Sequence, residues 1–261
     1  MFSKFFGKKQ PEQKPQIPQD WGVYMCRVDD KEASFRINLA LASIAPIKGY
    51  DTRVCIRTWL LNPSERGFPT NEETQTLYDI EDALINELEA KGAVFAGTVK
   101  SDGWFDFWLY AKDVKDYEAI INEKFSLFKG YKYSIDIKND AQWETYFEYL
   151  YPDDYSYSCM QNFKVLRNLA DNGDNASLPR DVDHFIDFDS EKDMENFGQK
   201  IEQIGYKILS KQPPREDLKK FSINIVRNQN LKNIDEDTWE LINLAKDFSG
   251  VYDGRGCPIA K

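Results

Sequence analysis

The chain has 261 residues, of which 41% are hydrophobic and 14% aromatic, so it can bury one large core or two ordinary ones and is not a disordered protein. Its 44 acidic and 34 basic side chains give a net charge of −10 at neutral pH. An acidic surface repels phosphate backbones and anionic membranes, which disfavours direct nucleic-acid binding and favours basic protein partners. Solubility alone is the alternative reason for such a charge.

Cysteine usage and apolar runs indicate the compartment. No two of the four cysteines have the spacing of a zinc or redox motif, and we therefore expect free thiols, no metal and no cofactor. No stretch approaches the roughly 20 apolar residues that a membrane span needs. The N-terminus lacks an adequate apolar core for a secretion signal. These features predict a cytoplasmic protein.

Residues 1–20 are expected to form a flexible leader, because residues 10–20 are rich in proline and glutamine. Phe2, Phe5 and Phe6 alternate with lysines in this leader. A short amphipathic anchor is the alternative to a frayed terminus.

The first domain is predicted to span residues 21–152 as an α+β sandwich, with an antiparallel or mixed sheet and helices on one face. A long helix begins after Thr70 or Asn71, either of which can cap it, and a second helix covers residues 114–128. A short closing helix is expected at 143–150. Strands are expected at 23–28, 33–39, 52–61, 93–99, 104–110 and 131–137.

The second domain is predicted to span residues 153–261 with the order α-β-α-β-β-α, close to a ferredoxin-like sandwich. The inner face of its last helix is expected to carry Trp239, Ile242 and Leu244 or Ala245. The segment 253–256 is interpreted as a docking loop or simple chain terminus. Helices are expected at 158–170, 191–204 and 235–248, and strands at 182–188, 206–211 and 221–227. The chain is thus expected to be an α+β protein of two tandem α/β sandwich domains.

Several separated blocks of the second domain carry a family resemblance over residues from about 156 to 258. They are the turn 172–174, the Pro179-Arg180 step into residues 182–185, the acidic helix start at 189–193 and the closing run 250–254. In this order they resemble the regulator of ribonuclease E activity B. The resemblance implies a small acidic inhibitor protein that binds another protein. Members often have tryptophan where Phe185 and Arg255 stand.

Residues 21–152 resemble a second bacterial family, domain-of-unknown-function family 695. The matching blocks are 67–69, 77–82, 97–103 and the run from Trp143 through Pro152. This resemblance implies no activity. It does imply that the pairing of two such domains is a recurrent bacterial layout.

His184 is the only histidine, and it lies on a strand whose alternation places it beside apolar neighbours. We expect a structural, buried, neutral imidazole that holds a backbone carbonyl, with a partner contact or catalysis as alternatives. The acids from Asp187 to Asp193 lack the glycine and the closing glutamate of a calcium loop. No nucleophile elbow, phosphate-binding loop or HExxH motif is present, so we expect no enzyme.

The sequence therefore favours a non-enzymatic regulator whose second domain binds a basic or disordered segment of a ribonuclease or its scaffold. Carboxylates would bind the partner's arginines and lysines, and aromatic side chains would anchor it. Two alternatives stay open: a partner unrelated to ribonuclease E, with the first domain setting specificity, and an unrecognised enzyme. The candidate contacts are Arg180, Asp183, Phe185, Asp187, Tyr252 and Asp253.

Overall fold

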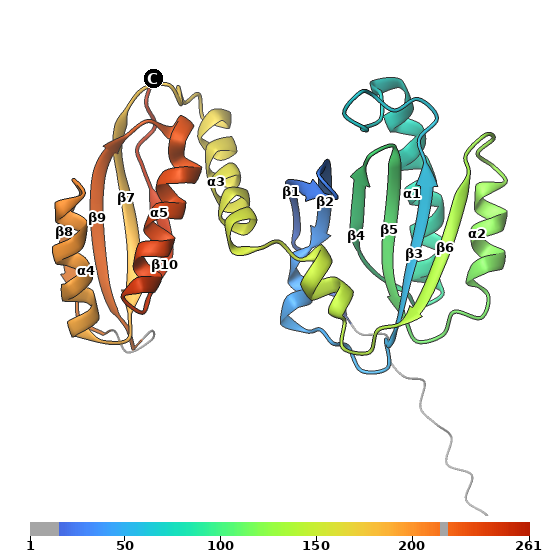
Figure 1. Cartoon of the computed structure of the whole chain (residues 1–261), viewed down its shortest axis with the longest axis horizontal. Helices are drawn as coiled ribbons and strands as arrows, with labels where there is room; N and C mark the ends of the chain where they lie inside the picture. Colours follow the sequence, from blue (N-terminus) through green and yellow to red (C-terminus); the bar gives the residue numbers. More distant parts are fainter. Residues whose placement is uncertain (1–15, 215–218) are drawn as a thin grey trace, which may run out of the picture. The chain divides into compact units, whose positions relative to one another are not determined.

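The computed structural model describes residues 16–214 and 219–261, and the chain divides into two compact units between Pro152 and Asp153 (Figure 1). The aromatic residues of the predicted leader lie outside the described residues. Its last part does not form a mobile leader. Asn38 Nδ2 donates to the Pro18 carbonyl at 2.9 Å, and Asn38 Oδ1 accepts from the Asp20 amide at 3.0 Å. Residues 18–20 are therefore fixed to unit 1.

Unit 1 is built on a six-stranded sheet in which every neighbouring pair is antiparallel, in the order β1-β2-β4-β5-β3-β6. This decides between the antiparallel and mixed sheets that the sequence left open. Helices α1 (Asn71–Ala90) and α2 (Tyr117–Phe125) cover one face of it, and the Thr70 side chain caps α1. The strands are β1 (Trp21–Val28), β2 (Lys31–Asn38), β3 (Thr52–Trp59), β4 (Val94–Ser101), β5 (Trp104–Ala111) and β6 (Tyr133–Asn139).

Both faces of this sheet are covered, whereas the sequence predicted helices on one face only. On β5, Phe107 and its neighbours at two-residue spacing join the core beneath α1, and the alternate residues point the other way. There Tyr110 stacks on Trp143 at 3.8 Å between ring centroids, and Trp108 meets Tyr149 edge-on. Tyr149 belongs to a short π-type helix, Thr145–Leu150. Aromatic residues thus bury the second face.

Unit 2 is a four-stranded antiparallel sheet in the order β10-β7-β9-β8, covered on one face by α4 and α5 (Figure 1). After α3, the chain order is β-α-β-β-α-β, which is the ferredoxin-like arrangement. The predicted α+β class is confirmed. The elements are α3 (Asp154–Asp171), β7 (Arg180–Phe188), α4 (Glu191–Gln203), β8 (Lys207–Gln212), β9 (Phe221–Gln229), α5 (Ile234–Asp247) and β10 (Gly250–Gly256).

Two details of unit 2 differ from the sequence prediction. Residues 253–256, expected as a loop or terminus, belong to the edge strand β10, because the backbone pairs with β7 despite three glycines in 250–256. The inner face of α5 carries Ile234, Thr238, Leu241 and Ala245. Of the predicted set, Ala245 is confirmed and Leu244 packs against the same core, whereas Trp239 and Ile242 are only partly buried. The reason is that α3 covers a second side of α5, where Trp239 meets Tyr155 at 5.3 Å.

Within the described part of the chain, no helix combines the length and apolarity needed to cross a membrane.

Candidate functional site

The sheet of unit 2 has one face that its packed helices do not cover. On β7 the side chains of Ile186 and Phe188 are fully buried toward α4 and α5, and Val182 is fully buried on the same face beside Leu169 of α3 and Ile234 of α5. The alternate residues Asp183, Phe185 and Asp187 point to the opposite face, and Phe185 is 40% exposed there. The sequence predicted this alternation. It places three of the six candidate contacts together on one open surface.

Strand register gathers further polar residues around them. On the open face, two neighbouring rows of paired residues run across the four strands from β10 to β8. Each row contains one of the predicted contacts. The rows are Gly254–Phe185–Asn224–Ser210 and Val251–Asp187–Ser222–Gln212. Because glycine and serine are small, they leave space beside the Phe185 ring.

That space is a hollow of about 230 Å³, which we call the acidic hollow. Asp187 and Asp253 provide its two carboxylates, and Asp187 accepts a hydrogen bond from Ser222 Oγ at 2.5 Å. Asn224 Oδ1 is buried and has no hydrogen-bond donor among the described residues. The acidic hollow is lined by Phe185, Asp187, Ser210, Gln212, Ser222, Ile223, Asn224 and Asp253.

The acidic hollow has the chemistry of a receptor for a cationic side chain. Carboxylates form charge-assisted hydrogen bonds with guanidinium or ammonium groups, and an exposed aromatic ring adds a cation–π contact. The unsatisfied Asn224 oxygen supplies one more acceptor for an N–H group. An arginine carries five such donors in a planar fork, so it can use several of these acceptors at once.

Sequence reasoning missed Asn224, Ser222 and Ser210, because their contribution depends on which strands are neighbours. A signal was present in the sequence all the same. Residues 222–225 alternate Ser-Ile-Asn-Ile, which indicates a strand with one apolar face and a polar face over two positions. The order of strands in the sheet, by contrast, is not encoded in any one segment.

Two candidate contacts do not lie on the open face. Arg180 is only 5% exposed, so it does not offer a partner surface. Tyr252 pairs with Ile186 in the register and points toward the helices, where its hydroxyl meets His184 Nδ1 at 2.8 Å. Asp253 lies at an irregularity between Tyr252 and Gly254 and lines the acidic hollow.

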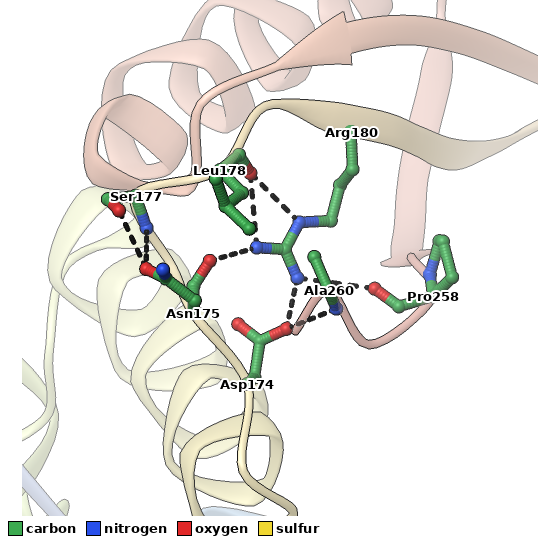
Figure 2. A network of polar contacts seen from close by, with 7 residues as sticks. All are labelled: Asp174, Asn175, Ser177, Leu178, Arg180, Pro258 and Ala260. Carbon is green, nitrogen blue, oxygen red and sulfur yellow. Dashed lines mark hydrogen bonds and ion pairs between the residues drawn. The ribbon is translucent and has the colours of Figure 1, made fainter.

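Arg180 instead holds the end of the chain against the start of β7 (Figure 2). Its guanidinium forms an ion pair with Asp174, whose side chain is 1% exposed, and donates to the carbonyls of Asn175 (2.6 Å), Leu178 and Pro258 (3.2 Å). Asp174 also accepts from the Ala260 amide at 2.7 Å. Through its hydrogen bond, Arg180 lowers the pKa of Asp174. The Arg180 side chain is therefore a structural clamp.

His184 is fully buried, as its apolar strand neighbours suggested, but its partners are side chains and not a backbone carbonyl. Nε2 lies 2.7 Å from Gln229 Oε1, and Gln229 Nε2 donates to Asp237 Oδ2 at 2.7 Å. With the amide oriented in this way, Nε2 must carry the proton, so Nδ1 accepts from the Tyr252 hydroxyl. The two hydrogen bonds of the imidazole therefore connect β7 to β10, through Tyr252, and to β9, through Gln229.

Burial lowers the pKa of His184 to about 4, which makes stability depend on pH. An unfolded histidine binds a proton near pH 6.5, whereas the folded one does not. The contribution of the neutral His184 to the free energy of unfolding is therefore fully present above pH 6.5 and is lost as the pH falls to 4. We expect a loss of about 3 kcal/mol across that window. Urea unfolding at pH 7 and 4.5 measures it, with His184→Gln as the reference that lacks the titration. Equal losses in both proteins would show that His184 is not the group responsible.

Among the described residues, no group of three or more His, Cys, Asp or Glu side chains is arranged to hold a metal ion. The buried Asp106 of unit 1 is bound on both carboxylate oxygens by Arg57 at 2.7 Å, and burial raises its pKa. This pair lies on the face of the first sheet that aromatic residues cover. Each carboxylate oxygen of Asp106 has its hydrogen-bond donor within the pair.

Comparisons with known proteins match each unit to a family. The model of a family of unknown function (DUF695) matches residues 19–151, and that of the regulator of ribonuclease activity B matches residues 159–257. Both predicted resemblances are confirmed. No curated protein matches the chain.

Two of the solved structures that match the chain cover most of it at low sequence identity. An unknown protein from Galdieria sulphuraria is 13% identical with a TM-score of 0.23, covering 81% of this chain and 99% of its own. A candidate glycine cleavage system transcriptional repressor is 11% identical with a TM-score of 0.24, covering 80% and 98%. At these TM-scores neither likeness carries an argument.

Proposed function

The chain belongs to the family of unknown function DUF695 and carries a regulator of ribonuclease activity B domain after it, and on this premise we propose that it is a non-enzymatic regulator that works by binding a protein. The description of the second family supports a regulatory role. A regulator without a catalytic centre of its own acts through a binding surface. The open face of unit 2 is the surface with the chemistry for that task.

The partner in this proposal is a basic segment of ribonuclease E or of its scaffold, and binding inhibits RNA turnover. The observation that carries this is the acidic hollow, with Asp187 and Asp253 beside an exposed Phe185. An arginine of the partner enters the hollow, and Asp183 attracts a neighbouring lysine or arginine on the same strand face. Phe185 provides the apolar anchor, because aromatic residues are enriched among those that contribute most of the binding energy at protein interfaces.

A second candidate is a basic protein partner unrelated to ribonuclease E. The presence of a complete additional domain favours it, because a regulator of one enzyme could act with the second unit alone. In that case the first unit would set specificity.

Titration of the full chain with a labelled basic segment of ribonuclease E tests the first candidate. We expect binding at low salt that weakens by about tenfold or more between 50 and 300 mM sodium chloride, because salt screens exposed charges. A segment of the same length with its arginines and lysines replaced by glutamine is the matched control. Equal affinity of the two segments would contradict the proposal, as would an affinity that salt does not change. If basic segments of unrelated proteins bind as tightly, the second candidate is favoured.

A further inference from the structure

A groove on the other side of β10 has a chemistry opposite to that of the acidic hollow. It measures about 730 Å³ and lies between α3, α5 and β10; we call it the α3–α5 groove. The two helices also contact each other directly, through the ion pair of Lys246 with Asp154 (2.5 Å) and through the cluster of Leu169 with Ile234. Its volume falls in the range typical of small-molecule sites.

Charge in the α3–α5 groove favours an anion. The ionisable residues that line it are the cations Lys164, Lys246 and Arg255 and the anions Asp154 and Asp253. Three cations and two anions give a net charge of +1, in a chain whose total is −10. Asp154 is already paired with Lys246, and Asp253 also lines the acidic hollow. The groove is thus a locally positive site on an acidic protein.

Arg255 is the centre of this positive charge. Its Nε donates to Asn162 Oδ1 at 2.8 Å and its Nη2 to the Asn162 carbonyl at 3.3 Å. Its Nη1 is buried and has no acceptor among the described residues, where no carboxylate forms an ion pair with the guanidinium either. A buried donor without an acceptor is costly, and an arginine in a protein keeps its charge. The groove therefore lacks one anionic acceptor.

The rest of the wall is largely carbon. Val165 of α3, Ile242 of α5 and the rings of Tyr157 and Tyr252 line it. None of these side chains offers a charge, and they suit a flat apolar body. The combination of an apolar wall with one arginine at its end is the usual design of a site for an organic acid.

We propose that the α3–α5 groove binds a small aromatic carboxylate. Its anionic group is held by Arg255, whose guanidinium turns to present Nη1, and its ring lies between Ile242 and Tyr252. This site lies on the other side of β10 from the open face that the proposed function assigns to the partner protein, with Asp253 lining both, and it gives the regulator a second, small-molecule ligand.

Calorimetric titration of the full chain with 2-naphthoate and with 2-naphthamide tests the site, because the two probes share a ring and differ in charge. We expect 2-naphthoate to bind about tenfold or more tightly than 2-naphthamide, since charge-assisted bonds are the stronger ones. Arg255→Gln should abolish this preference, whereas Lys232→Gln, which removes an exposed cation outside the groove, should keep it. Equal binding of the probes, or binding of neither, would overturn the proposal.

A second variant covers the case in which Arg255→Gln does not fold. Ile242→Glu keeps the arginine and places a carboxylate on the groove wall. It should weaken 2-naphthoate by about tenfold or more and 2-naphthamide much less, because like charges repel. Unchanged affinity for 2-naphthoate in this variant would equally overturn the site. Far-ultraviolet circular dichroism of each variant checks that the fold is kept.

Discussion

Replacing Asp183 and Asp187 together with lysine is expected to weaken binding of a basic partner segment by about 100-fold or more, with no loss of the fold. Both side chains lie on the face of β7 opposite to α4 and α5, so no core contact is removed. Each change replaces an attraction by a repulsion. Coupling energies between close charges across an interface start at about 1.5 kcal/mol, and about 1.4 kcal/mol is a factor of ten in affinity.

The matched control is Asp79→Lys with Asp82→Lys on α1 of unit 1. Both positions are exposed, and the change in net charge is the same, so a general effect of charge appears equally in both proteins. Fluorescence anisotropy of the labelled segment measures both affinities at one salt concentration. If the two double variants bind alike, the open face of unit 2 is not the binding surface, and only the overall charge of the chain matters.

The sequence predicted the fold well wherever a pattern is local. The alternation in β7 was read directly, because side chains on a strand point to opposite faces in turn. The glycine-rich β10 was missed, because its strand conformation comes from pairing with β7 and not from the propensity of residues 250–256. The observed inner face of α5 differs in part from the predicted one for a similar reason, since α3 covers a second side of this helix and buries part of Trp239.

The candidate site was predicted in part. Asp183, Phe185 and Asp187 follow from one strand, and the structure keeps them on one surface. Asn224 and Ser222 are more than 30 residues away and reach the hollow only through the strand order β7-β9. Arg180 was misassigned because an arginine beside a turn reads as exposed. Its partners, Asp174 and the carbonyl of Pro258, are separated by most of unit 2 along the chain.

Replacing Arg180 with methionine is therefore expected to act on stability, and not on the partner surface. The change removes every hydrogen bond of the guanidinium and leaves Asp174 buried with the Ala260 amide as its remaining partner in this network. Removing one member of a buried ion pair strongly destabilises a protein, because the other charge stays without compensation. We expect the unfolding midpoint of unit 2 to fall by several degrees, and faster hydrogen exchange in residues 250–261 of the full chain.

Arg167→Met on the exposed side of α3 is the control for this change, because it removes the same charge from the same unit without touching the clamp. Hydrogen exchange followed by mass spectrometry separates the two units, since peptides from 21–152 should exchange as before in both variants. Below the midpoint, Arg180→Met should bind the basic segment with unchanged affinity, because Asp183, Phe185 and Asp187 are intact. Weaker binding with normal exchange at the chain end would instead make Arg180 a contact for the partner, and would contradict its role as a structural clamp.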